Sequence, residues 1–213
     1  MIPGAVLFDL DGTITESGTG ITKSVAYALQ KQGIVETDRA KLNLFVGPPL
    51  LQSFQVYYGF TPEQARQGVE DYREYYAVKG IYENRVYDGV ELMLQALRDA
   101  GRRCILATAK PEHYAVLILK HFGLSQYFEA ICGATMDERR TNKTEVIAYA
   151  LEKTGVTQGV MVGDREHDIL GAKAHHLASV GVLYGYGSRQ ELETAGADQI
   201  AATPREAAQI ILS

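Results

Sequence analysis

The sequence predicts an α/β fold in which a parallel sheet covered by helices carries an all-helical insertion. Short apolar runs alternate with capped helices along most of the chain, whereas the stretch 16–85 has apolar residues at helical spacing throughout. The chain has 213 residues, which exceeds a common single domain of about 100–150 residues and leaves room for an insertion. We therefore expect an α/β core formed by residues 1–15 and 86–213 and an inserted helical domain formed by residues 16–85.

Five apolar segments have the length and the β-branched content of buried strands. They are residues 5–10, 103–108, 130–133, 159–163 and 179–184. The segments between them begin and end as helices do, with glycines at positions 101, 123 and 155 marking three C-termini. Strands that alternate with helices in this way predict a parallel sheet with helices on both faces.

The insertion differs from the rest of the chain in charge and in periodicity. Residues 16–85 hold eight basic and eight acidic residues, so the whole net charge of -5 lies in the predicted core. Apolar positions such as Val69, Tyr72 and Tyr76 recur at helical spacing, and Gly47-Pro48-Pro49 interrupts the pattern. We expect about four helices in this unit.

Composition excludes several classes of partner. The pI near 5.6 and the negative net charge argue against a nucleic-acid backbone as the main partner. No apolar run approaches the roughly 18–20 residues that a membrane helix needs, and no basic segment precedes an apolar stretch at the N-terminus. We expect a cytoplasmic protein, as a monomer or a homodimer, with Cys104 and Cys132 as buried free thiols.

The residues that end the predicted strands carry the chemistry, because ligands of open parallel sheets bind at the carboxyl ends of the strands. Carboxylates, a hydroxyl and a lysine follow three of the strands or open the next helix. They are Asp9, Asp11 and Gly12 where the first strand ends, Thr108 and Ala109 where the second ends, Lys143 at the start of a helix, and Asp164 with Asp168 where the fourth ends and shortly after it. These residues are the candidate site.

Four carboxylates at one sheet edge repel each other unless a cation binds between them. All-oxygen ligands without histidine or cysteine select Mg²⁺ over zinc or copper. A cation also keeps Asp9 ionised and able to attack phosphorus, a known route through an aspartyl-phosphate. Lys143, Thr108 and the backbone at Ala109 would stabilise the phosphoryl oxygens in the transition state.

These motifs resemble those of the haloacid dehalogenase superfamily of phosphatases. Asp9-Leu-Asp11-Gly-Thr13 resembles the first motif, Thr108 with Lys110 the second, Lys143 the third, and the run from Gly163-Asp164 to Asp168 the fourth, all in the family's order. The resemblance covers essentially the whole chain. It implies a Rossmann-like core with a helical cap between the first and second motifs, and it is greatest to the phosphoglycolate phosphatase-like group.

The resemblance also implies roles for single residues. Asp9 is the expected nucleophile, and Asp11 the group that protonates the leaving oxygen and activates water. Mg²⁺ is expected on Asp9, the Asp11 carbonyl and Asp164, with Asp168 in support. Substrate contacts are expected at Gly12, Gly47, Thr108, Ala109 and Lys143. Ala109 departs from the Asn, Ser or Gly that often follows the second-motif threonine, so a side-chain contact to substrate is absent there.

The expected activity is hydrolysis of a small phosphate monoester such as phosphoglycolate. A 5′-nucleotidase acting on nucleoside monophosphates and a phosphomutase would keep the same core residues and stay open, as does a non-catalytic binding protein. A dehalogenase of this family lacks the second aspartate, so Asp11 argues against it. Asp168 could instead only cap the following helix, and Gly185-Tyr186-Gly187 lacks the third glycine of a dinucleotide-binding loop.

Overall fold

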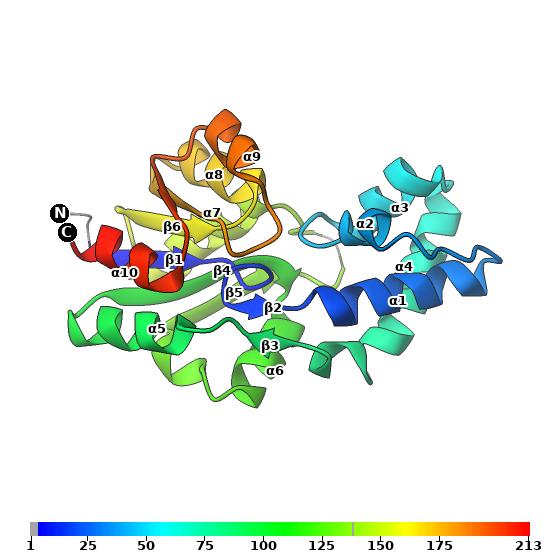
Figure 1. The fold of residues 1–213 in the computed structure, drawn as a ribbon, viewed down its shortest axis with the longest axis horizontal. Helices are drawn as coiled ribbons and strands as arrows, with labels where there is room; N and C mark the ends of the chain where they lie inside the picture. Colours follow the sequence, from blue (N-terminus) through cyan, green and yellow to red (C-terminus); the bar gives the residue numbers. More distant parts are fainter. Residues whose placement is uncertain (1–3, 138) are drawn as a thin grey trace. The chain divides into compact units, whose positions relative to one another are not determined.

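The computed structural model describes residues 4–137 and 139–213 (Figure 1). The described chain divides into two compact units, one made of the residues up to Thr15 together with Val86–Ser213 and the other of Glu16–Arg85. These bounds coincide with those expected for the core and for the helical insertion. None of the helices in the described ranges is long and apolar enough to span a membrane.

The first unit is built on a six-stranded sheet, in which every pairing between neighbours is parallel. In spatial order its strands are β5 (Ala130–Ala134), β4 (Arg103–Pro111), β1 (Ala5–Phe8), β6 (Gly159–Gly163), β7 (Ala178–Val182) and β8 (Gln199–Ala201). The predicted α/β class is confirmed, and β1 lies between β4 and β6. The carboxyl ends of these three strands are therefore adjacent.

The strand bounds differ from the expected ones at the ends that form the site. β1 stops at Phe8, so Asp9 and Leu10 lie beyond it, and β4 continues to Pro111 with a register shift after Thr108. β8 was not expected, because it has only three residues and begins with the exposed Gln199.

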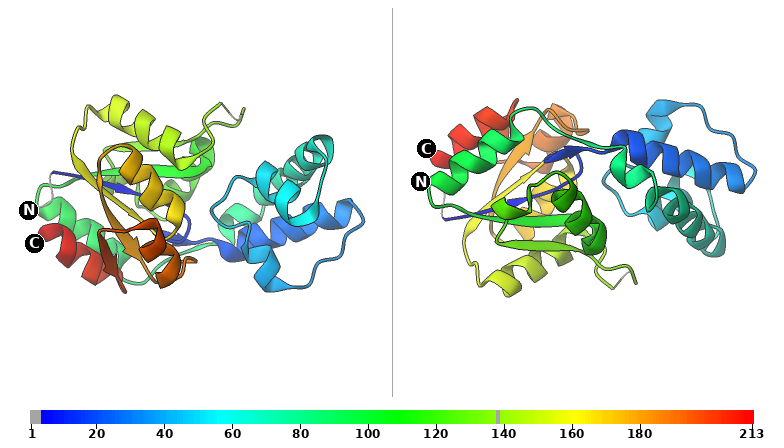
Figure 2. Two further views of the ribbon diagram at one scale, coloured as in Figure 1. Left: turned by 90° about the horizontal axis from the view of Figure 1, so that it is seen from above. Right: turned by 90° about the horizontal axis from the view of Figure 1, so that it is seen from below.

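Helices cover both faces of the sheet, and several begin at residues that can cap them. The helices are α5 (Val90–Asp99), α6 (Glu112–His121), α7 (Lys143–Thr154), α8 (Glu166–Ala174), α9 (Arg189–Ala195) and α10 (Pro204–Leu212). Figure 1 shows α7 and α8 on one face of the sheet and α5 and α10 on the other, and Figure 2 gives two further views. Asn142 and Glu145 form a capping box that fixes the start of α7, so Lys143 is its first residue.

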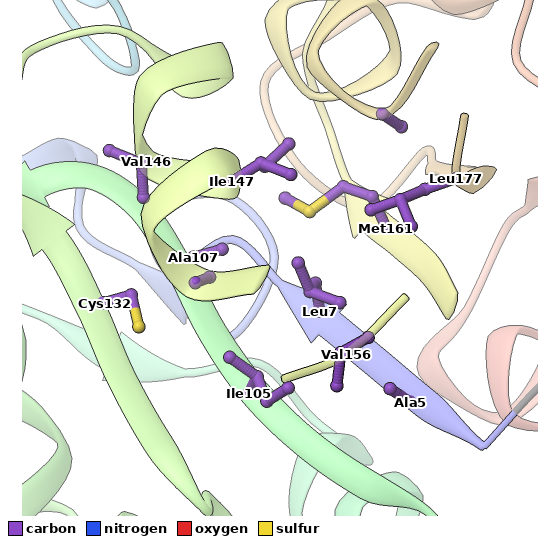
Figure 3. Packing of buried hydrophobic residues seen from close by; sticks show 12 residues of the cluster. Ala5, Leu7, Ile105, Ala107, Cys132, Val146, Ile147, Val156, Met161 and Leu177 are labelled. Carbon is purple, nitrogen blue, oxygen red and sulfur yellow. The ribbon is translucent and has the colours of Figure 1, made fainter. Parts of the chain in front are cut away.

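The core on one face of the sheet comes from alternate strand residues and from α7. Leu7 of β1 and Ile105 of β4 belong to one buried cluster with Val146 and Ile147 of α7 (Figure 3). Cys132 belongs to the same cluster, and burial raises the pKa of its thiol to about 11. Both cysteines are buried and unbridged, as expected.

The second unit consists of four α-helices, as expected, and one 3₁₀ turn. They are α1 (Gly18–Lys31), α2 (Arg39–Asn43), α3 (Leu50–Tyr58), α4 (Pro62–Tyr76) and η1 (Gly80–Tyr82). α3 begins directly after Pro49, and α4 begins with a capping box of Thr61 and Gln64. Where the chain enters and leaves this unit, β2 (Thr15–Glu16) pairs with β3 (Arg85–Val86).

The contact between α1 and η1 depends on the absence of a side chain at Gly20. A Cβ on Gly20 would lie 1.9 Å from the carbonyl oxygen of Gly80. We expect Gly20→Ala to destabilise the protein by about 2 kcal/mol or more, because backbone atoms must move to relieve the clash. Urea unfolding measures the effect, and Thr19→Ala, at an exposed neighbouring position of the same helix, is the matched control. Equal unfolding midpoints for the two variants would contradict the prediction.

Candidate active site

The site lies at the carboxyl ends of β1, β4 and β6. Asp9 follows β1 directly, Thr108 lies in β4, and Asp164 follows Gly163, the last residue of β6. The backbone N–H of Asp9 donates to the carbonyl of Val162 at 3.0 Å, which continues the pairing of β1 with β6 past the end of the strand. Neighbouring parallel strands thus bring residues from distant parts of the sequence to one edge.

The buried side chain of Lys143 forms ion pairs with two carboxylates at this edge of the sheet. Its Nζ lies 2.6 Å from Oδ1 of Asp9 and 2.8 Å from Oδ1 of Asp168, and it donates to the carbonyl of Ala107 at 3.1 Å. Burial alone lowers the pKa of Lys143, but Asp168 and Asp9 more than offset this and hold it above its ordinary value. The lysine therefore stays protonated next to Asp9.

Three buried carboxylates form a candidate metal site. One oxygen from each of Asp9, Asp164 and Asp168 lies within 4.8 Å of the others. Oδ2 of Asp164 accepts a hydrogen bond of 2.7 Å from the N–H of Tyr186, while its Oδ1 is buried without a hydrogen-bond partner in the described part of the chain. Burial, with Asp168 and Asp9 nearby, raises the pKa of Asp164 well above its ordinary value. The three carboxylates and the unpartnered oxygen fit a hard divalent cation such as Mg²⁺.

Asp11 does not belong to this group, which corrects the expectation of four clustered carboxylates. Its Oδ2 lies instead 2.7 Å from Nζ of Lys110, and both side chains are buried. The reason is that β1 ends at Phe8 and the chain turns at Gly12, whose φ is +90°, so strand alternation no longer sets the direction of Asp11. The expected metal contact through the Asp11 carbonyl concerns a different atom and stays a prediction.

The chain matches the family model of haloacid dehalogenase-like hydrolases over residues 6–182. It belongs to this family. Among its relatives, a 5′-nucleotidase from Pseudomonas aeruginosa is 47% identical over 88% of this chain and 86% of the relative. A phosphoglycolate phosphatase from Xanthomonas campestris is 36% identical over 86% of this chain and 85% of the relative. A tyrosine-protein kinase, PtkA, from Mycobacterium tuberculosis is 40% identical over 87% of this chain but only 64% of its own length.

Solved structures agree with this assignment. A predicted phosphatase from Clostridium acetobutylicum has a TM-score of 0.97 and 46% identity, with 100% of this chain and 99% of that chain covered. A haloacid dehalogenase-like hydrolase from Streptococcus pneumoniae has a TM-score of 0.90 and 29% identity over 97% of both chains. The resemblance inferred from the motifs is therefore confirmed.

Asp168 of the hydrolase caps α8, which is one of the two functions considered from the sequence, while its support of a metal stays a prediction. Its Oδ2 accepts from the backbone N–H of Arg165 at 3.1 Å and so caps α8, while its Oδ1 meets Lys143. Arg165 in turn lies 2.8 Å from Glu191 of α9. Capping thus fixes the carboxylate of Asp168 beside Asp9 and Asp164, in the candidate metal site.

Glycines let the segment 185–187 lie directly against Asp164. A Cβ on Gly187 would be 1.8 Å from the Asp164 carbonyl oxygen, and one on Gly185 would be 2.3 Å from the carbonyl oxygen of Gly12. A Cβ on Gly12 would meet Oδ2 of Asp164 at 2.2 Å. The glycines of this segment therefore let the backbone approach a carboxylate of the hydrolase closely. Sequence reasoning had tested them only against a nucleotide-binding pattern.

The remaining predicted residues occupy different places. Thr108 is buried, and its Oγ1 accepts from the backbone N–H of Lys110 at 3.2 Å, so the second motif lies at the same edge as Asp9. Ala109, between Thr108 and Lys110 in the sequence, is half-buried.

The predicted contacts with substrate stay predictions. Gly47 belongs to the second unit, and the other residues of this set are Gly12, Thr108, Ala109 and Lys143. The sequence interpretation placed Lys110 in the second motif with Thr108 but gave it no catalytic or binding role.

Proposed function

We propose that this hydrolase is a Mg²⁺-dependent phosphomonoesterase that acts through a phosphorylated Asp9. The observation that carries the proposal is the position of Asp9. Its buried carboxylate contacts the protonated Lys143, and it lies close enough to the carboxylates of Asp164 and Asp168 for the three to bind one cation. A carboxylate held in this way has the form and the surroundings of a nucleophile for phosphoryl transfer.

In the first step an oxygen of Asp9 attacks phosphorus, and the bond from phosphorus to the leaving oxygen breaks. Asp11 gives its proton to that oxygen, so an alcohol leaves and an aspartyl-phosphate remains. In the second step a water oxygen attacks phosphorus and Asp11 takes up the water proton. The bond from phosphorus to the Asp9 oxygen breaks, so inorganic phosphate and the free Asp9 carboxylate form.

The other residues act on the charge of the phosphoryl group. Lys143 remains protonated and offers its N–H groups to the phosphoryl oxygens, and the Thr108 hydroxyl and the Ala109 N–H add further donors. Asp9, Asp164 and Asp168 would hold Mg²⁺, which when bound neutralises charge on the phosphoryl oxygens and on the carboxylates.

Phosphoglycolate is the first substrate proposed, because phosphoglycolate phosphatases occur among the relatives. A nucleoside 5′-monophosphate is the second candidate, favoured by the 47% identity to a 5′-nucleotidase. The same proposal includes a small phosphorylated metabolite as partner and a cytoplasmic location.

Phosphate release from a panel of monoesters tests the proposal. Phosphoglycolate, nucleoside 5′-monophosphates and sugar phosphates are assayed with Mg²⁺ and with EDTA. We expect release that requires Mg²⁺ and a kcat/KM that is about tenfold or more higher for the preferred class, since recognition of one substrate class commonly has at least this effect. Absence of Mg²⁺-stimulated release from every ester would contradict the proposal and would favour a binding protein.

The same panel separates hydrolysis from transfer to another acceptor. A phosphomutase would isomerise a sugar phosphate without releasing phosphate, because it must exclude water. The relative named as a tyrosine-protein kinase makes a tyrosine hydroxyl a further acceptor to include. If isomerisation or tyrosine phosphorylation exceeded phosphate release, the main acceptor of the phosphoryl group would be a sugar phosphate or a tyrosine hydroxyl instead of water.

A further inference from the structure

Lys110 forms a buried ion pair that the proposed mechanism has not used. Its Nζ lies 2.7 Å from Oδ2 of Asp11, and the exposed fractions of the two side chains are 5% and 10%. Lys110 lies within the register shift of β4, between Thr108 and Pro111, and its backbone N–H donates to Oγ1 of Thr108 at 3.2 Å. The second motif thus fixes the backbone from which Lys110 reaches Asp11.

The two oxygens of Asp11 are in different situations. Oδ2 is held by Lys110, whereas Oδ1 is buried and has no hydrogen-bond partner within residues 4–137 and 139–213. A buried carboxylate oxygen without a partner is costly, so such an oxygen often has a task in the working protein. An acid that protonates a leaving oxygen needs one oxygen free and the rest of the group held still.

The two lysines of the site, Lys143 and Lys110, form ion pairs with different carboxylates. Lys143 touches Asp9 and Asp168, the carboxylates at the proposed phosphoryl and metal positions. Lys110 pairs with Asp11, which lies outside the metal group. A mobile carboxylate beside a divalent cation would be drawn to it, and the ion pair with Lys110 opposes that movement.

We propose that Lys110 is a positioning residue for Asp11, one that holds Oδ2 so that Oδ1 faces the leaving group and keeps the carboxylate out of the metal group. This inference rests on the proposed phosphatase function.

The dependence on the leaving group tests this role. The alkoxide that leaves phosphoglycolate needs a proton, whereas 4-nitrophenolate leaves without one. For Lys110→Met we expect kcat/KM on phosphoglycolate to fall by about 10- to 100-fold, a part of what a general acid contributes, and kcat/KM on 4-nitrophenyl phosphate to change by less than about threefold. The ratio of the two values for one protein sample does not depend on how much of that sample is folded.

A double-mutant cycle with Asp11→Asn supplies the second readout. If Lys110 acts through Asp11, adding Lys110→Met to Asp11→Asn should change kcat/KM on phosphoglycolate by less than about twofold. The double variant holds no unpaired buried charge, so it serves where Lys110→Met alone folds poorly. Lys120→Met, which removes an exposed lysine from α6, is the matched control and should resemble the wild type.

Each outcome bears on one of the two proposals. Equal losses on both esters, or a full additional loss in the double variant, would mean that Lys110 binds the phosphate directly and would overturn the positioning role alone. Wild-type turnover no higher than that of Asp9→Asn on 4-nitrophenyl phosphate and on every ester of the panel would overturn the proposed function, and the role of Lys110 with it.

Discussion

Replacing Asp9 with asparagine is expected to lower phosphate release by on the order of 10³-fold or more, because the amide cannot form the phosphorylated intermediate. The side chains have nearly the same shape, and Asn Oδ1 can still accept from Lys143, which lies 2.6 Å from Asp9 Oδ1. The fold should therefore remain intact. Steady-state release of phosphate measures the first effect, and thermal unfolding measures the second.

A direct search for the intermediate accompanies this variant. Acid quenching during turnover followed by intact-mass analysis should show a phosphoryl adduct on the wild type and none on Asp9→Asn. Asp99→Asn, at an exposed carboxylate of α5 that pairs with Gln95, is the control and should keep both turnover and adduct. Asp9→Asn that retains more than a few per cent of wild-type turnover would remove Asp9 as the nucleophile.

The parts of the fold that could be predicted are those with a local cause. Strands buried on both faces read as continuous apolar runs, which is why β1, β4 and β6 were found. β8 was missed because three residues that begin with the exposed Gln199 give no such run. The start of α7 could be placed because Asn142 and Glu145 form a capping box, and this fixes Lys143 as its first residue.

Which residues lie together in the candidate site could be predicted from the sequence, but the directions of their side chains could be predicted less well. The ends of adjacent strands meet, so Asp9, Lys143 and Asp164 could be grouped from the order of motifs alone. The direction of Asp11 could not, because it depends on a turn outside the strand and on Lys110, which lies 99 positions away along the chain. The approach of Gly187 to Asp164 is equally non-local, since a glycine in the sequence does not say what lies next to it.

Asp164→Asn is expected to have opposite effects on activity and on the stability of the metal-free protein. Burial, together with Asp168 and Asp9, raises the pKa of Asp164 well above its ordinary value of 3.8, so its charged form destabilises the fold at neutral pH. Asparagine removes that charge and can still accept from the N–H of Tyr186. We expect metal-free Asp164→Asn to be about 1 kcal/mol or more stable than the wild type, which corresponds to roughly 2–4 °C in Tm, while phosphate release is lost.

The way in which the free energy of unfolding of the metal-free protein changes with pH provides a check on the raised pKa of Asp164. Because the folded-state pKa lies above the unfolded one, the folded metal-free protein binds more protons between pH 3.8 and the raised value. Its free energy of unfolding therefore decreases as pH rises through that interval. Asp164→Asn should remove the part of this slope that is due to Asp164, and the part that is due to Asp168, whose pKa burial also raises, should remain.

Mg²⁺ should reverse the order of the two proteins. A ligand that binds only the folded state stabilises it by about 2.7 kcal/mol at 100 times its Kd, so Mg²⁺ should raise the Tm of the wild type and leave that of Asp164→Asn nearly unchanged. Asp99→Asn is again the control and should respond to Mg²⁺ as the wild type does. If Mg²⁺ stabilised Asp164→Asn as much as the wild type, the cation would bind elsewhere, and the group of Asp9, Asp164 and Asp168 would lose its assigned role.

The stability of the metal-free proteins has a contradicting outcome of its own. If metal-free Asp164→Asn were less stable than the metal-free wild type, contacts that outweigh the cost of burial would hold Asp164 in its charged form.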